Sequence, residues 1–222
     1  CREEPRLWGL RNEFLSAPRL DDLACCYGTL EGFLASEADR DALLYCVFDN
    51  EEVGSLSRQG AASTFLIDTL ARLFQSFELT SDQSRAVLAR SILVSADNAH
   101  AFHPGYPSVA DPVNRPKLNG GLVLKHQAAL RYTTDAVTGA LCRMLCRAHK
   151  IKLQEYTNHS DQRGGSTLGN RSNIQISLRA MDVGLPQLAM HSAYETMGAE
   201  DPACLAAFTE AFFSDTLPEV QE

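Results

Sequence analysis

Short runs of continuous apolar residues alternate with amphipathic stretches along this chain, and this alternation limits its possible folds. Strands are predicted at 43–48, 91–97, 121–126, 152–157 and 176–183. Helices are predicted at 21–36, 60–77, 81–90, 135–150, near 170–174 and at 201–214. The run LLYCVF at 43–48 is apolar throughout, which indicates a strand buried on both faces. Strands that alternate with helices in this way favour an α/β fold.

Two long loops interrupt the pattern. Residues 103–121 contain four of the nine prolines, which predicts an extended loop and not a helix or a central strand. Residues 159–170, HSDQRGGSTLGN, form a glycine-rich loop that lacks the pattern of a phosphate-binding P-loop, so nucleotide binding is disfavoured. Neither stretch resembles an interdomain linker. We therefore expect residues 1–222 to form a single α/β domain.

The charge balance disfavours nucleic acid as a partner. The chain has 20 Lys and Arg residues against 28 Asp and Glu residues, a formal net charge of −8, and a phosphate backbone requires a basic surface. The sequence contains no apolar run of the length that a membrane span requires, and no signal peptide is visible. The seven cysteines are too sparse for a secreted disulfide scaffold, so we expect reduced thiols and a cytoplasmic protein.

Acidic residues follow several of the predicted strands. Glu51 and Glu52 come after the strand at 43–48, and Asp97 ends the next one. Asp21 opens the first helix, and His191 follows the last strand. Functional groups of open α/β folds gather at the carboxyl ends of strands. Carboxylates with an imidazole and no thiolates suit a hydrolytic zinc, manganese or cobalt site.

The Glu51–Glu52 pair suits a division of labour at such a site. Neighbouring side chains of extended backbone point to opposite faces, so one glutamate could bind a metal while the other reaches a water molecule as general base. Each candidate also has a structural interpretation. The glutamate pair could be solvated, Asp21 could cap a helix, Asp97 could form a turn, and His191 could be a buried core histidine.

Six ordered motifs resemble those of the aspartyl aminopeptidases, a family of co-catalytic di-zinc exopeptidases. The string FDNEEVGS at 48–55 resembles the family signature, and SADNAHAFHPGY at 95–106 resembles a second family segment. The other motifs are PRLDDL (18–23), GLVLKHQAALRYTTDA (121–136), GGSTLG (164–169) and DVGLPQLAMHS (182–192). The resemblance extends from residue 14 to about residue 198. It implies a three-layer α/β/α mixed sheet of the zinc-exopeptidase type, a peptide substrate and a homo-oligomer.

The resemblance also implies a role for each candidate. Asp21 matches the carboxylate that bridges two zinc ions, Glu51 the general base, and Asp97 a ligand of the second metal. Glu52 and His191 match ligands of the first metal. Further residues are expected to line the substrate cleft, namely Lys125, His100, His103, Tyr132, Gly165, Ser166 and Met190. Lys125 would suit acidic N-terminal residues, although it could also be a solvated lysine at a strand edge, and the two histidines could stabilise loops.

Two family features have no match in the sequence. Members carry an upstream His-x-Asp segment and an inserted dimerisation domain, whereas no histidine precedes His100 here. The chain thus resembles the C-terminal half of a member, with one of the two zinc sites incomplete. We expect a metalloaminopeptidase, or alternatively an inactive fragment or interaction subunit that needs a separate N-terminal chain. A third interpretation makes Cys1 an N-terminal nucleophile.

Overall fold

The computed structural model describes residues 3–38, 41–162 and 164–218, and its centre is a four-stranded mixed sheet. The strands are β3 (Ile92–Ala96), β7 (Arg179–Gly184), β5 (Leu122–His126) and β6 (Leu153–Thr157), in the order β3-β7-β5-β6. The β3–β7 and β5–β6 pairs are parallel, whereas β5 and β7 are antiparallel. All four strands lie within or close to the predicted ranges.

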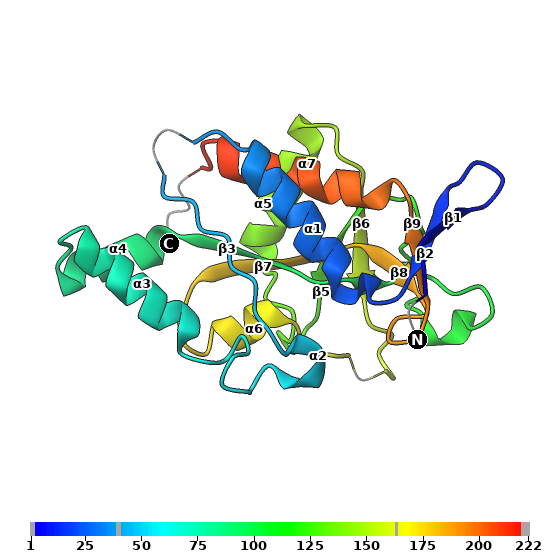
Figure 1. The fold of residues 1–222 in the computed structure, drawn as a ribbon, viewed down its shortest axis with the longest axis horizontal. Coiled ribbons are helices and arrows are strands. Elements are labelled where there is room, and N and C mark those ends of the chain that lie inside the picture. Colours follow the sequence, from blue (N-terminus) through cyan, green and yellow to red (C-terminus); the bar gives the residue numbers. More distant parts are fainter. Residues whose placement is uncertain (1–2, 39–40, 163, 219–222) are drawn as a thin grey trace.

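Helices cover both faces of this sheet (Figure 1). The helices α1 (Leu20–Ala35), α5 (Ala136–Ala148) and α7 (Asp201–Ser214) lie on one face, and the short α6 (Leu168–Ser172) lies on the other. The core forms where the first face meets the helices, and it includes Leu122, Leu124, Cys142, Leu145, Met181, Val183, Leu205 and Phe208. Burial of these apolar side chains is the main stabilising contribution to the fold. The predicted three-layer mixed α/β class is confirmed.

A second sheet of five short strands lies beside the first. Its strands are β1 (Arg6–Trp8), β2 (Phe14–Ala17), β9 (Glu195–Gly198), β8 (Pro186–Leu188) and β4 (Ala99–His100), in the order β1-β2-β9-β8-β4. We predicted only a short connection at 186–191, where β8 in fact lies. Strands of two to four residues are too short to show a period in the sequence, so this sheet was not predicted.

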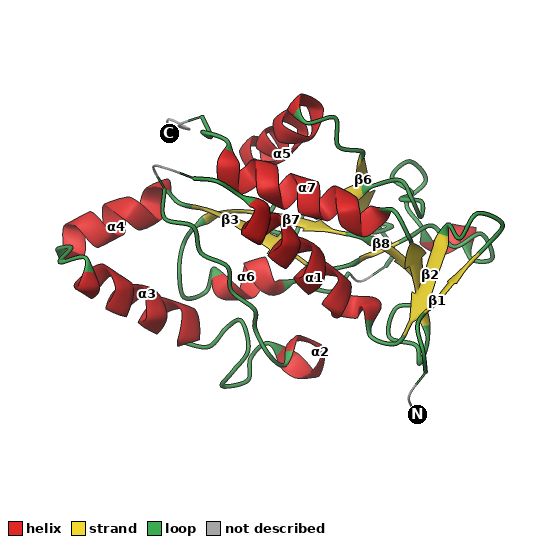
Figure 2. Cartoon of the chain, turned by 45° about the horizontal axis from the view of Figure 1, so that its top comes forward, coloured by secondary structure: helices red, strands yellow, loops and turns green. Residues whose placement is uncertain are grey.

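Two further helices follow one another at one end of the molecule (Figure 1). The helices α3 (Phe65–Ser76) and α4 (Ser81–Arg90) form a hairpin that extends beyond the edge of the main sheet (Figure 2). A capping box at Thr80 starts α4. A single helical turn, η1 (Pro107–Val109), interrupts the proline-rich loop. Among the described residues, no helix combines the length and apolar character that a membrane crossing requires.

The strand predicted at 43–48 is wrong. Residues 42–48 have no regular secondary structure, because no strand among the described residues pairs with them. Leu44 and Val47 are 43% and 54% exposed, so this apolar run is not buried on both faces. As a consequence Glu51 and Glu52 do not follow a strand. They open the short helix α2 (Glu51–Gly54), and the extended-backbone argument for their division of labour does not hold.

Candidate metal centre

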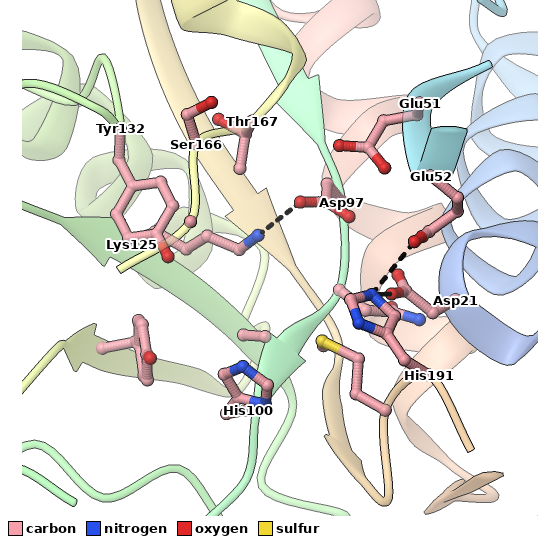
Figure 3. Close-up of a pocket in the computed structure, with 15 residues that line it drawn as sticks. Asp21, Glu51, Glu52, Asp97, His100, Lys125, Tyr132, Ser166, Thr167 and His191 are labelled. Atoms are coloured by element: carbon pink, nitrogen blue, oxygen red, sulfur yellow. Dashed lines mark hydrogen bonds and ion pairs between the residues drawn. The ribbon is translucent and has the colours of Figure 1, made fainter. Parts of the chain in front are cut away.

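A cavity of about 250 Å³ opens where the main sheet meets the five-stranded sheet. Four separate segments bring the sequence-predicted ligands and general base to it (Figure 3). Asp21 comes from the start of α1, Glu51 and Glu52 from α2, Asp97 from the end of β3, and His191 from the loop after β8. The sequence-predicted ligands and general base are therefore neighbours in space, although they lie far apart in the chain.

The first group of possible ligands consists of Asp21, Glu52 and His191, whose ligand atoms lie within 4.8 Å of one another. The His191 Nε2 atom lies 3.1 Å from Asp21 Oδ2 and 3.0 Å from Glu52 Oε2. The backbone of His191 is left-handed, with φ of 66°, and this turns the ring toward the two carboxylates. Two carboxylates and one imidazole form a donor set that a catalytic zinc ion accepts, with a position left open.

The second group consists of Asp21, Asp22 and Asp97, again with ligand atoms within 4.8 Å of one another. Asp21 is common to both groups, which is the arrangement expected of a bridging carboxylate. The Oδ1 atoms of Asp21 and Asp22 are buried and have no hydrogen-bond partner among the described residues. Buried carboxylate oxygens without a partner are costly, and a cation would satisfy them. The sequence analysis did not single out Asp22, although it is adjacent to Asp21 in the motif PRLDDL.

The acidic cluster is electrostatically strained without a cation. Burial, with the nearby charges of Asp97 and Glu52, raises the pKa of Asp21 to about 9. Burial and the charge of Asp97 also raise the pKa of Asp22 well above its usual range. The same two causes raise the pKa of Glu51 to about 7. Like charges that share a poorly solvated site disfavour ionisation, so a divalent cation would stabilise this arrangement.

Lys125 supplies a positive charge at the inner wall of the cavity. Its side chain is 2% exposed, and its Nζ atom lies 3.1 Å from Asp97 Oδ2 and 5.4 Å from the centre of the Tyr132 ring. Burial lowers the pKa of Lys125, but the charges of Asp97, Tyr132 and Asp182 and the hydrogen bond to Asp97 together outweigh burial and raise the pKa. Lys125 therefore stays protonated. It is not the solvated strand-edge lysine that the sequence left open.

Glu195 positions two members of the first ligand group, Asp21 and His191, and it was not predicted from the sequence. Its side chain is buried, and its two oxygens accept hydrogen bonds from the backbone N–H groups of Asp21 (2.9 Å) and His191 (2.7 Å). It comes from β9, a strand that was itself not predicted. Only its position in a motif could have indicated it, and the motifs quoted above end before residue 195.

Asp182 anchors the glycine-rich loop beside the cavity. Its buried carboxylate accepts hydrogen bonds from the backbone and the hydroxyl of Thr133 and from the hydroxyl of Thr167. Thr167 also lines the cavity. These hydrogen bonds hold the loops that contain Thr133 and Thr167 against the middle of β7. They therefore fix the position of the glycine-rich loop next to the cavity.

Most of the residues expected at the substrate cleft line this cavity, namely Lys125, His100, Tyr132, Gly165, Ser166 and Met190. His103 does not line it, and this expectation needs correction. The imidazole of His103 lies 5.1 Å from the Tyr106 ring, measured between ring centres, and its Nδ1 accepts a hydrogen bond of 3.1 Å from the Gly105 backbone. These local contacts hold His103 exposed in the proline-rich loop.

The chain is similar to proteins of one family. A probable M18 family aminopeptidase 2 from Clostridium novyi is 40% identical over 199 residues, which are 90% of this chain and 46% of the relative. The crystal structure of an M18 aminopeptidase from Thermotoga maritima has a TM-score of 0.88 and 25% identity, covering 96% of this chain and 48% of that one. The S. cerevesiae mApe1 dodecamer has a TM-score of 0.78 and 30% identity, covering 95% and 48%.

The chain thus spans about half the length of the curated relatives it matches. The expectation of a zinc aminopeptidase family is confirmed at the level of the family. Residues 2–213 match the family described as aminopeptidase I zinc metalloprotease (M18), and the chain belongs to this family.

Proposed function

We propose that this chain carries the catalytic centre of a metalloaminopeptidase, which releases N-terminal residues from peptides. The observation that supports this most directly is the position of Glu51. It lines the cavity beside both ligand groups but belongs to neither, so its carboxylate is not needed to hold a metal. A carboxylate in this position can accept a proton from water and return it to a leaving amine.

Zinc is the metal that we propose for the first ligand group. Asp21, Glu52 and His191 would hold it, and manganese or cobalt would suit the same mixed donors. When bound, zinc acts as a Lewis acid that acidifies water and polarises the scissile carbonyl. The second group, Asp21, Asp22 and Asp97, has only carboxylates among the described residues, so we expect it to bind zinc more weakly. One tight zinc per chain is the expected result of elemental analysis.

The substrate's N-terminal residue is proposed to be acidic. Lys125 is the only lysine or arginine among the described residues that line the cavity, and Tyr132, Ser166 and Thr167 surround it with hydroxyl groups. An ammonium group and neutral hydroxyls favour a carboxylate side chain over an aliphatic one. Because Lys125 is already paired with Asp97, we expect a preference for acidic residues and not strict specificity.

Replacing Glu51 by Gln tests the catalytic proposal. The variant loses the proton acceptor but keeps the ligand groups, so hydrolysis of aspartyl, glutamyl and leucyl amides should fall by about 10²–10⁴-fold. The zinc content, measured by elemental analysis, should not change. Glu31→Gln, on the exposed side of α1, is the matched control and should retain activity. Activity in Glu51→Gln equal to that of the control would refute the role of Glu51.

An alternative is that the chain is inactive alone and functions with a separate N-terminal chain. The incomplete second ligand group and the half-length match favour this alternative. The assay is therefore run with residues 1–222 alone and with the unmatched part of the Clostridium novyi relative added. Activity only in the mixture supports the alternative, and the Glu51→Gln result decides between a catalytic and an interaction subunit in either case.

The assembly and location of the protein are also proposals. The solved mApe1 is described as a dodecamer, which supports a homo-oligomer here. The six cysteines among the described residues are free, which fits the expected reducing compartment, the cytoplasm. The interpretation with Cys1 as nucleophile concerns a residue that lies outside the described part of the chain.

A further inference from the structure

Asn98 is a polar residue buried at the junction of the two sheets, between β3 and β4. The backbone on either side of it is fixed. The N–H of Asp97 donates to the Val183 carbonyl (3.0 Å), and the N–H of Ala99 donates to the Leu185 carbonyl (2.9 Å). Asn98 is 3% exposed and lines the cavity of the metal centre. Its side chain therefore extends from a fixed position, one residue after the possible ligand Asp97.

Both polar groups of the Asn98 amide have partners inside the protein. Its Nδ2 atom donates to the Leu20 carbonyl (2.8 Å) and to Gln187 Oε1 (2.6 Å). Its Oδ1 atom accepts a hydrogen bond of 3.0 Å from the Cys25 thiol. The orientation of the amide is defined, because the Leu20 carbonyl can only accept a hydrogen bond and must face the NH₂ group. A buried amide with these contacts holds its neighbours in one arrangement.

The contact with Leu20 acts on the ligand that both groups share. The Leu20 carbonyl and the Asp21 N–H belong to one trans peptide unit, which is planar. Asn98 binds the carbonyl of this unit, and Glu195 accepts a hydrogen bond of 2.9 Å from its N–H. The two groups of a trans unit point in opposite directions, so two buried side chains hold the unit from opposite sides. A rotation of this plane would move the Asp21 carboxylate.

We propose that Asn98 is a positioning residue of the metal centre, and that Asn98 and Glu195 together clamp the Leu20–Asp21 peptide unit. The clamp fixes the carboxylate of Asp21 relative to that of Asp97, and both carboxylates face the cavity (Figure 3). This inference rests on the proposed function, because it concerns the metal centre of that function. Residues that orient metal ligands through hydrogen bonds contribute to metal affinity without touching the ion.

The two clamping residues serve different ligand groups through the same peptide unit. Asn98 connects Asp21 to Asp97, which belong to the second group. Glu195 connects Asp21 to His191, which belong to the first group. Loss of either residue leaves the peptide unit held from one side only. Once one residue is lost, loss of the other should therefore change the position of Asp21 less.

Asn98→Leu tests the clamp, because leucine keeps the branched shape of the side chain but cannot donate to the Leu20 carbonyl. We expect about 10–100-fold lower zinc affinity, measured on residues 1–222 by competition with a chelator. Asn98→Ala is a second variant, which should change the affinity in the same direction if leucine does not fit. Thermal unfolding in EDTA shows that each variant is folded, and it separates a loss of stability from a loss of zinc affinity.

Two control variants break comparable hydrogen bonds without releasing the Leu20 carbonyl. Asn173→Ala removes an amide that donates to the Leu178 carbonyl (3.0 Å), and Asn173 does not line the cavity of the metal centre. Gln187→Met removes the other acceptor of the Asn98 amide. Both controls should lower the stability of the fold and leave the zinc affinity unchanged. An affinity loss in Gln187→Met as large as that in Asn98→Leu would contradict the clamp, because zinc affinity would then follow core stability.

The double variant with Asn98→Leu and Glu195→Gln tests whether the two residues act on one peptide unit. The effects of independent sites on affinity multiply, whereas those of coupled residues do not. We expect the double variant to lose less zinc affinity than the product of the two single losses, by about threefold or more. Losses that multiply would show that Asn98 and Glu195 act separately, and this would overturn the clamp.

The remaining outcomes separate this inference from the proposed function. Zinc affinity in Asn98→Leu and Asn98→Ala equal to that of the unmodified chain would overturn only the role of Asn98. An unmodified chain without tight zinc would overturn the proposed metal centre, and the clamp with it. None of these measurements uses a substrate, so a failure of the proposed hydrolysis would not affect them.

Discussion

Among single residues, Glu195 shows how a side chain outside the possible ligands can shape the proposed metal centre. One carboxylate fixes the backbone on both sides of the site, at Asp21 and at His191, which are 170 positions apart (191 − 21). Residues that orient metal ligands through such contacts contribute strongly to affinity although they do not touch the ion. Glu195 is therefore a positioning residue in the proposed zinc site.

Replacing Glu195 by Gln should weaken zinc binding. The amide retains one acceptor for the two backbone N–H groups, so either Asp21 or His191 loses its support, and we expect about 10–100-fold lower zinc affinity. Competition with a fluorescent chelator measures this. Glu210→Gln, at an exposed position of α7, is the control. Unchanged affinity in the Glu195 variant, with the control also unchanged, would show that the ligands hold their positions without it.

Asp182 allows a second prediction, on stability. In Asp182→Asn an NH₂ group replaces one acceptor oxygen and faces the donors of Thr133 and Thr167. A buried donor left without an acceptor costs about 1–3 kcal/mol. Urea unfolding should show this loss, whereas Asp161→Asn, at an exposed position of the glycine-rich loop, should not. If Asp182→Asn loses no more stability than Asp161→Asn within experimental error, other contacts hold the two loops in place.

Among the elements, the α1–α7 pair depends on the close approach of two glycines in α1. A Cβ atom at Gly32 would lie 2.3 Å from the Ala206 carbonyl oxygen and 2.6 Å from Thr209 Cβ. At Gly28 the nearest atom, Leu205 Cδ2, would be 3.2 Å away. Gly32 therefore sets the distance between the helices, and Gly28 leaves room for a small adjustment.

Because Gly32 lies closer to α7 than Gly28 does, substitution by alanine should destabilise the protein at Gly32 but not at Gly28. Gly32→Ala must push the helices apart, and overpacking of this kind costs about 1–3 kcal/mol. Gly28→Ala should be nearly neutral, because alanine favours the helix by about 1 kcal/mol relative to glycine. Denaturant unfolding of the two variants makes the comparison within one helix. Equal destabilisation by both would show that loss of glycine itself, and not the contact with α7, is responsible.

The elements also show which parts of the fold a sequence can predict. The longer helices and the four main strands were predicted from their patterns, whereas the short helix α2 was not. Residues 42–48 carry an equally strong pattern but do not form a strand, because strand formation needs a neighbour that the local sequence does not specify. For the same reason the short strand β9 escaped prediction, and Glu195 with it. Motif order indicated Asp21 and His191, whereas their distance could come only from the structure.

In the molecule as a whole, the metal centre connects distant parts of the chain. Its possible ligands come from the start of α1, from α2, from the end of β3 and from the loop after β8. Part of the formal net charge of −8 is concentrated in this cluster of carboxylates. Unfolding separates these segments and destroys the site, so zinc should bind the folded chain in strong preference to the unfolded one.

This preference predicts that zinc raises the stability of the entire domain. At a free zinc concentration about 100 times the Kd, the gain should be about 2.7 kcal/mol. Thermal unfolding followed with zinc and with EDTA measures it. His191→Ala removes the only imidazole of the first ligand group and should abolish the shift. His149→Ala, which removes a surface contact with Asp215, should retain it.

The two histidine variants also distinguish a specific site from a general effect of charge. Zinc that merely screens the acidic surface would stabilise both variants equally, because they carry the same carboxylates. Zinc held at the proposed centre needs the imidazole between Asp21 and Glu52, so only the His149 variant should respond. An equal response of both variants would show that the stabilising zinc binds elsewhere. Zinc at Asp21, Glu52 and His191 would then not be what holds α1, α2 and the loop after β8 together.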